Sequence, residues 1–130
     1  MFRLIKILNS GVNVPETVKL KKSATLDVKM GSAIVIVDGI VTLATPNAKP
    51  THIALSDAGN GTTSIPCYPV FENMLFETTV NADPSALQVG SKVTISANSE
   101  CVTSTTSSGV ATVVELLGAK AAGDRITVKF

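Results

Sequence analysis

The segment from residue 33 to residue 43 constrains the fold most, because it predicts a tight β-hairpin from local sequence alone. Ala33–Val37 (AIVIV) is rich in β-branched residues, and so is Ile40–Leu43 (IVTL). Only Asp38 and Gly39 lie between them, and this pair suits a type I′ turn, which needs positive φ at both central residues. The chain is therefore expected to contain antiparallel sheet.

Further short segments with strand character follow along the chain. They are Leu26–Met30, His52–Leu55, Ser64–Val70, Leu75–Val80, Lys92–Ala97, Val110–Glu115 and Arg125–Phe130. In the last, RITVKF, apolar and polar residues alternate, which is typical of a strand with one buried face. Met1–Leu8 fits a short helix as well as a strand, and we favour the strand because Phe2 and the isoleucines prefer it.

Turn-forming residues separate these segments. Pro66 and Pro69 lie within one predicted strand, and since proline cannot donate to a β-ladder, we expect an edge or irregular strand there. Helix signals are weak, although Asp83 and Pro84 could start a single turn. Many short strands at this spacing predict one all-β domain over residues 1–130, a small β-barrel or β-sandwich with at most one short helical turn.

Charge is sparse and unevenly distributed. Charged residues make up 16% of the chain, below the roughly 25% of typical domains, and the net charge of +1 gives no general case for nucleic-acid binding. Residues 1–30 hold six basic and two acidic residues, a net charge of +4, whereas residues 31–130 hold five basic and eight acidic residues. The basic N-terminal part could meet an acidic protein surface, or it could be an ordinary solvated strand face.

We expect a cytoplasmic protein without membrane contact. The longest apolar run is Ala33–Val37, far short of the ~18 residues of a membrane helix. Arg3 and Lys6 interrupt the apolar N-terminus, whereas a signal peptide needs an uninterrupted apolar core. Cys67 and Cys101 are too few for a disulfide framework or a zinc site. We expect two reduced thiols, unless the strands that carry them are neighbours.

Residues that could support catalysis are scarce. His52 is the one histidine, and no nucleophile motif accompanies it, so an ordinary surface or interface histidine is the simpler interpretation. Residues 57–61 contain two glycines but match neither a phosphate loop nor a calcium loop. Glu72 and Glu77 are five residues apart, on opposite faces of a regular strand. The five aromatics do not interleave with a basic stripe. We expect no enzyme, no cofactor, no metal site and no nucleic-acid partner.

The order of segments resembles the small capsid decoration or head-stabilising proteins of tailed bacteriophages. A basic, proline-containing N-terminal segment comes first, followed by the hairpin, the segment THIALSDA, a strand, a spacer, and a closing segment with a hydrophobic strand, a Gly-Asp turn and a terminal strand. The segments are NSGVNVPETVKLKKSATLDVKMG (9–31), GSAIVIVDGIVTLA (31–44), THIALSDA (51–58), PVFENMLFETTV (69–80), ADPSALQVGSKVTIS (82–96) and GVATVVELLGAKAAGDRITVKF (109–130). The resemblance covers most of the chain and includes no diagnostic motif.

The resemblance implies a non-enzymatic role on the outside of a phage head, with the major capsid protein as partner. It also implies an extended N-terminal arm, here residues 1–25, that adds a strand to a capsid sheet, and a possible trimer on the capsid. By this hypothesis Phe2, Leu4 and Ile7 anchor the arm, and Arg3, Lys6, Lys21 and Lys22 meet an acidic capsid rim. Deleting residues 1–22 would then abolish capsid binding and leave the domain folded.

Two other classes of protein remain open from the sequence. One is another virion structural part, such as a head-fibre base or a tail-tube protein, which would assemble into rings or tubes in the absence of capsid. The other is a carbohydrate- or cell-surface-binding β module. Such modules stack exposed aromatic rings on sugars, and five aromatics without tryptophan argue against that class.

Overall fold

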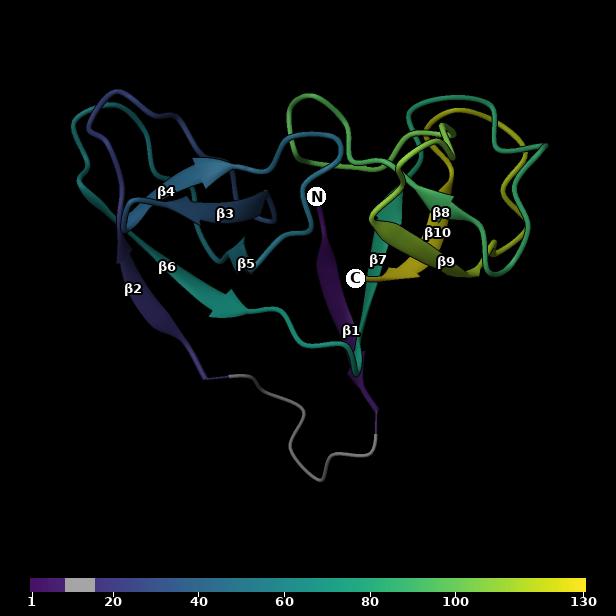
Figure 1. The fold of residues 1–130 in the computed structure, drawn as a ribbon, viewed down its shortest axis with the longest axis horizontal. Coiled ribbons are helices and arrows are strands. Elements are labelled where there is room, and N and C mark those ends of the chain that lie inside the picture. Colours follow the sequence, from purple (N-terminus) through teal and green to yellow (C-terminus); the bar gives the residue numbers. More distant parts are fainter. Residues whose placement is uncertain (9–15) are drawn as a thin grey trace.

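The protein is built from short β-strands. The structure is a computed structural model that describes residues 1–8 and 16–130, and within these ranges it contains ten strands and no helix (Figure 1). The strands are β1 (Arg3–Ile7), β2 (Val18–Lys21), β3 (Ala33–Val37), β4 (Ile40–Leu43), β5 (His52–Ala54), β6 (Ser64–Pro69), β7 (Met74–Thr79), β8 (Lys92–Val93), β9 (Ala111–Glu115) and β10 (Arg125–Lys129). The all-β prediction is confirmed. Among the described residues, no helix could span a membrane.

The strands form two five-stranded antiparallel sheets. Sheet A has the order β1-β7-β10-β9-β8, and sheet B has the order β2-β6-β5-β3-β4. Sheet B curls until its two edges touch at one parallel bridge, between Lys22 and Val41. Figure 1 shows sheet B on the left and sheet A on the right. Of the two predicted architectures, the sandwich-like one describes this molecule, because sheet A is open and the single bridge between the edges of sheet B does not make a closed barrel.

The predicted hairpin forms with the expected turn. β3 pairs with β4 so that Val37 lies opposite Ile40. Asp38 and Gly39 have φ values of 50° and 77°, both in the left-handed region that a type I′ turn requires. A two-residue turn of this type matches the twist of the strands it joins, which explains why this local sequence predicts its structure so well.

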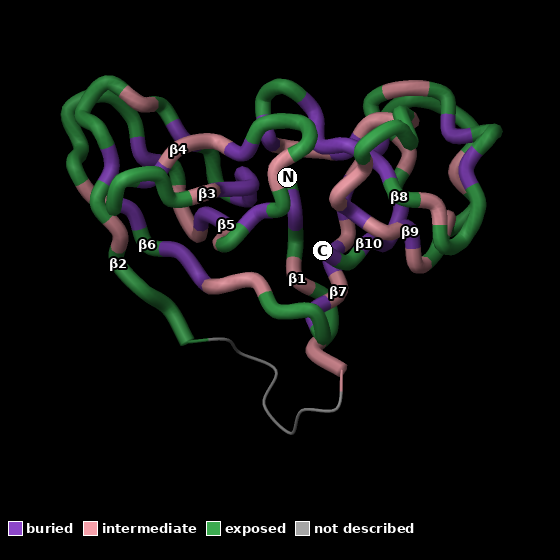
Figure 2. The backbone as a smooth tube through the Cα atoms, viewed as in Figure 1, coloured by how far each residue is buried: buried purple, intermediate pink, exposed green. Residues whose placement is uncertain are grey.

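Apolar side chains form two clusters. The larger lies between the sheets, where Ala33, Ile53 and Tyr68 of sheet B meet residues of sheet A. Tyr68 stacks on Phe76 with ring centroids 6.3 Å apart, and the Phe130 ring packs against Phe76 with centroids 5.5 Å apart. The smaller cluster fills the inside of the curl of sheet B, with Val28, Ile34, Val41, Ala54, Ala58, Ile65 and Cys67. Figure 2 shows these buried stretches alternating with exposed loops.

The strand with two prolines is central, so the expectation of an edge strand is wrong. β6 pairs with β2 on one side and β5 on the other. The Pro66 carbonyl accepts a hydrogen bond from the N–H of Leu55 at 2.9 Å, one residue beyond the end of β5. The missing N–H of Pro66 therefore falls where this ladder already ends, and Pro69 is the last residue of the strand.

Other boundaries differ from the predicted ones. Val18–Lys21 is a strand that was not among the predicted ones, whereas Leu26–Met30 contributes only an isolated bridge between Val28 and Ala58. The predicted strand over Lys92–Ala97 is reduced to two residues. Pairing across sheets decides these cases more than local preference does.

The free N-terminal arm expected over residues 1–25 is corrected in its described parts. β1 pairs with β7 in sheet A, and β2 pairs with β6 in sheet B. Phe2 is 2% exposed and its ring lies 5.3 Å from that of Phe130. Removing residues 1–22 would delete two strands and a core ring, so the domain is not expected to stay folded. Residues 9–15 of the expected arm lie outside the described residues.

Candidate protein-interaction site

The N-terminal strand carries two faces of different character. Arg3 pairs with Glu77 and Leu4 with Phe76, but the next pair is Lys6 with Leu75. Ile5 is therefore the extra residue of a β-bulge. Because of this bulge, the two basic residues share the solvent face of sheet A although they are three residues apart. Leu4 and Ile7, also three residues apart, share the core face.

The predicted site residues are divided between partner-accessible and internal positions. Phe2 lies in the core, and Leu4 and Ile7 are half-buried against it, so Phe2 is not available as an anchor for another protein. Arg3 and Lys6 are exposed on β1. Lys21 is exposed on β2, in the other sheet. Lys22 is 4% exposed, and its assignment to a capsid rim is also corrected.

Lys22 is buried because its ammonium group holds a loop. Nζ donates hydrogen bonds to the carbonyl oxygens of Ser23, Gly59 and Thr62 at 2.9, 3.2 and 2.8 Å. All three donors of the ammonium are thereby satisfied by backbone. This lysine stabilises the loop beside β2 and β6, and no donor is left for a partner protein.

One carboxylate organises the solvent face of sheet A at its β1 end. Glu77 Oε1 lies 2.7 Å from Arg3 Nη2 and 3.3 Å from Arg125 Nη1. The two arginine side chains are 58% and 68% exposed, while the Glu77 side chain is 19% exposed. One negative charge between two positive charges leaves a local excess of +1, with donor groups still facing solvent.

An apolar groove of about 350 Å³ lies next to β1. Residues from five separate parts of the chain line it, namely Met1, Phe2, Arg3, Leu4, Thr17, Met30, Gly31, Ala54, Leu55 and Tyr68. Gly31 is required here, because its φ is +78° and a Cβ would meet the Met1 side chain and the Phe2 carbonyl oxygen. Its own carbonyl accepts the N–H of Phe2 at 2.9 Å.

Tyr68 forms part of this groove with its hydroxyl turned toward β1. Burial raises the pKa of Tyr68 to about 12, and a hydrogen bond with the Leu4 backbone acts in the opposite direction. The hydroxyl is therefore neutral at physiological pH. The groove offers mainly apolar surface, with Arg3, Thr17 and the neutral Tyr68 hydroxyl as its polar members, and this suits an apolar side chain of another protein.

Groups that could support catalysis are dispersed. His52 is half-buried, burial lowers its pKa, and its Nδ1 lies 3.0 Å from Thr51 Oγ1. Cys67 and Cys101 are both free. Within residues 1–8 and 16–130, no group of three His, Cys, Asp or Glu side chains could hold a metal ion.

The sequence did not indicate the groove residues outside β1. Met30, Gly31, Leu55 and Tyr68 lie far apart in the chain and come together only when sheet B packs against β1. The one local signal is Met30-Gly31, where an apolar residue and a glycine precede the hairpin. Nothing in that pair shows that β1 will lie beside it.

Comparison with known proteins gives a fold likeness. No protein-family model matches the chain, and the search of curated proteins found no match. Among solved structures, the chain is similar to the N base of the head fiber protein gp8.5 of bacteriophage phi29, with a TM-score of 0.58 and 16% sequence identity. The likeness covers 88% of this chain and 92% of that chain. At this identity it shows that the two share a fold.

Proposed function

We propose that this chain is a non-enzymatic structural component of a bacteriophage virion, located on the outside of the head. The observation that carries the proposal is the shared fold with the head fiber base of phi29, which spans nearly the whole of both chains. The overall order of sequence segments, which resembles that of phage head proteins, supports the same class independently. Among virion parts, the comparison favours a head-fibre base over a tail-tube protein.

The surface chemistry is consistent with attachment to other protein subunits. The groove beside β1 is apolar, and the solvent face of sheet A carries exposed guanidinium groups around Glu77. Protein interfaces combine apolar contacts with a polar rim in this way. In this role the chain binds the outer surface of the capsid, with the major capsid protein as its partner.

A carbohydrate-binding module has less support. Sugar-binding sites stack exposed aromatic rings on the sugar. Phe2, Tyr68, Phe76 and Phe130 are buried in the core, which leaves Phe71, 57% exposed, as the one ring at the surface. A single phenylalanine without a neighbouring ring does not form a stacking platform.

Antibody labelling of purified phage particles would test the proposal. Gold-labelled antibody against this chain should decorate the head in electron micrographs, and particles from a gene deletion should lack the label. Purified protein added back should bind the deletion heads at a fixed ratio to the capsid protein. Sedimentation velocity of the free protein would give its oligomeric state. Label confined to the tail, or no label on particles, would refute the proposed location.

A further inference from the structure

The solvent face of sheet A carries an excess of positive charge that the sequence does not show. Strand register and alternation place eleven side chains on this face, five of them basic and two acidic. They are Arg3, Lys6, Leu75, Glu77, Thr79, Lys92, Thr112, Glu115, Arg125, Thr127 and Lys129, of which Thr127 is buried, with 1% exposed. The basic members come from β1, β8 and β10, which belong to three distant parts of the chain.

Three of the basic residues form a row across the sheet, here called the lysine row (Lys6, Lys129 and Lys92). Lys92 lies opposite Thr112, and Thr112 lies opposite Lys129. Lys6 lies opposite Leu75. Because Phe76 pairs with Val128, the next residues on these two antiparallel strands, Leu75 and Lys129, lie at the same level as Lys6. Neighbouring strands are about 4.8 Å apart, so successive lysines, two strands apart, are about 10 Å apart.

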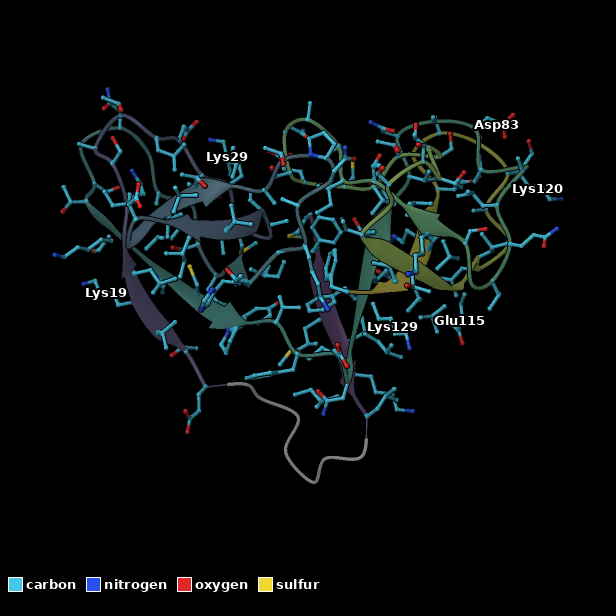
Figure 3. The ribbon with its side chains drawn as sticks, in the orientation of Figure 1. Lys19, Lys29, Asp83, Glu115, Lys120 and Lys129 are labelled. Carbon is cyan, nitrogen blue, oxygen red and sulfur yellow. The ribbon has the colours of Figure 1, made fainter. Side chains whose placement is uncertain are left out.

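The lysine row differs from the rest of the face in having no acidic counterpart. Arg3 and Arg125 share Glu77, but among the described residues none of the three lysines takes part in an ion pair. All three are exposed, and Leu75 and Thr112 between them are half-buried. Figure 3 shows Lys129 and Glu115 on the same side of the sheet, and that glutamate pairs in register with Thr127, outside the row.

Two β-bulges build this face. The bulge in β1 brings Lys6 onto the side of Arg3, and the register shift between β9 and β10 brings Glu115 onto the side of Thr112. Without the first, the alternation of a regular strand would put Arg3 and Lys6 on opposite faces. The positive face is therefore a product of the fold and not of a basic sequence run.

We propose that the lysine row is a docking surface for an acidic protein surface. This inference rests on the proposed function, in which the partner is another subunit of the virion. A row of unpaired ammonium groups on a sheet face gains Coulomb energy from carboxylates and loses little by desolvation when it lies at the rim of a contact. The half-buried Leu75 and Thr112 supply apolar and hydroxyl contact between the charges.

Protein fits this surface better than nucleic acid does. Duplex DNA carries one charge per about 1.7 Å of its axis, and three lysines about 10 Å apart neutralise few of those charges. The face has no aromatic side chain on which a base could stack. The chain as a whole has a net charge of only +1.

The test uses the full chain, labelled with nitrogen-15, and a poly-glutamate peptide as the probe. Amide shift changes should cluster on β1, β8 and β10. A triple variant, Lys6→Glu with Lys92→Glu and Lys129→Glu, should weaken binding by about tenfold or more, since like charges then face each other. A triple Lys→Gln variant at the same positions, which only removes charge, should show an intermediate loss and guards against misfolding of the first variant.

The matched control reverses three exposed lysines elsewhere, Lys19, Lys21 and Lys120. Figure 3 places Lys19 and Lys120 at opposite sides of the molecule, away from Lys129. The control should change the affinity for poly-glutamate less than about threefold, because salt screens charges that lie far from the bound peptide. An equal loss in the control, shift changes outside sheet A, no binding by the folded wild type, or tighter binding to a DNA duplex of equal charge would overturn the proposal.

Binding of the same variants to phage heads separates this inference from the proposed function. If wild-type protein binds poly-glutamate through the lysine row but does not bind heads, the proposed function fails and the surface stands. If wild-type protein binds heads and the triple Glu variant binds them equally well, the proposed function stands and the lysine row is refuted as the docking surface.

Discussion

Replacing Lys22 by methionine tests whether this lysine stabilises the fold instead of contacting a partner. Its Nζ donates hydrogen bonds to three backbone carbonyl oxygens at 2.8 to 3.2 Å, and the residue is 4% exposed.

The Lys22→Met variant keeps an unbranched apolar side chain of similar length and removes the charge together with all three hydrogen-bond donors. The variant therefore changes the hydrogen bonds more than the packing.

The magnitude follows from these hydrogen bonds. A hydrogen bond to a charged group contributes about 1.5–3 kcal/mol, so three independent bonds would contribute about 4.5–9 kcal/mol. The acceptor carbonyls belong to the exposed residues Ser23, Gly59 and Thr62, where water can replace the ammonium. Burial of the ammonium also costs desolvation energy in the native protein. We expect a net loss of about 2–3 kcal/mol in unfolding free energy, which lowers Tm by about 6–12 °C in a domain of this size.

Urea denaturation followed by circular dichroism would measure this loss. The matched control is Lys21→Met, at the exposed neighbouring position, which should change stability by less than about 0.5 kcal/mol. Amide hydrogen exchange gives a local readout, because the N–H of Gly61 donates to the Ala24 carbonyl at 2.8 Å beside the Lys22 loop. This amide should exchange faster in Lys22→Met than in the wild type.

A loss in Lys22→Met no larger than that in Lys21→Met would refute the reasoning. The same holds if Gly61 keeps its protection while global stability is unchanged. If Lys22→Met were as stable as the wild type but bound phage heads more weakly, the original prediction that Lys22 contacts a partner would be supported.

Three further predictions concern local features. Deleting Ile5 should close the bulge and leave every other β1 side chain on its face, so the unfolding free energy measured by urea titration should change by less than about 1 kcal/mol. Deleting Val35 from the regular strand β3 should instead prevent folding, because it moves the following residues to the opposite face. Equal effects of the two deletions would argue against the bulge. Burial raises the pKa of the Cys67 thiol to about 11, so at about pH 8 a disulfide reagent should modify only Cys101 in the native protein. Rapid modification of both thiols would contradict this prediction. Burial lowers the pKa of His52 below 6.5, so the unfolded chain binds a proton at this histidine before the native protein does, and stability should fall as pH drops below about 6.5. In His52→Gln, the melting temperature should depend less on pH than in the wild type. An unchanged dependence of melting temperature on pH would exclude His52 as its source.

Strands with clear local patterns could be predicted from the sequence. The hairpin over residues 33–43 and the terminal strand over Arg125–Lys129 form where the sequence places them. Both depend on short-range preferences, namely the positive φ of Asp38 and Gly39 and the alternation in RITVKF. β2 has only a four-residue alternation, Val-Lys-Leu-Lys, which was not predicted as a strand, and it pairs with β6 along its whole length.

The candidate site could be predicted only in part. Arg3 and Lys6 were correctly expected at the surface, but Phe2 and Lys22 are internal. A hydrophobic residue near a chain end fits an anchor and a core ring equally well, so sequence alone does not separate the two. For Lys22, the three carbonyl acceptors lie in Ser23 and in a loop about 40 residues away, which no local pattern reveals.

The fold class of this protein follows from local sequence, because period-two alternation and turn chemistry are properties of a few neighbouring residues. The sparse charge and the small number of catalytic residue types are also visible in the sequence. The strands divide into two sheets, the N-terminus belongs to the core, and Lys6, Lys129 and Lys92 share one row, and none of these features is visible before the chain is folded. These features depend on pairing between distant segments and on bulges that change the face of every residue after them, and such pairing is governed by packing across the whole chain.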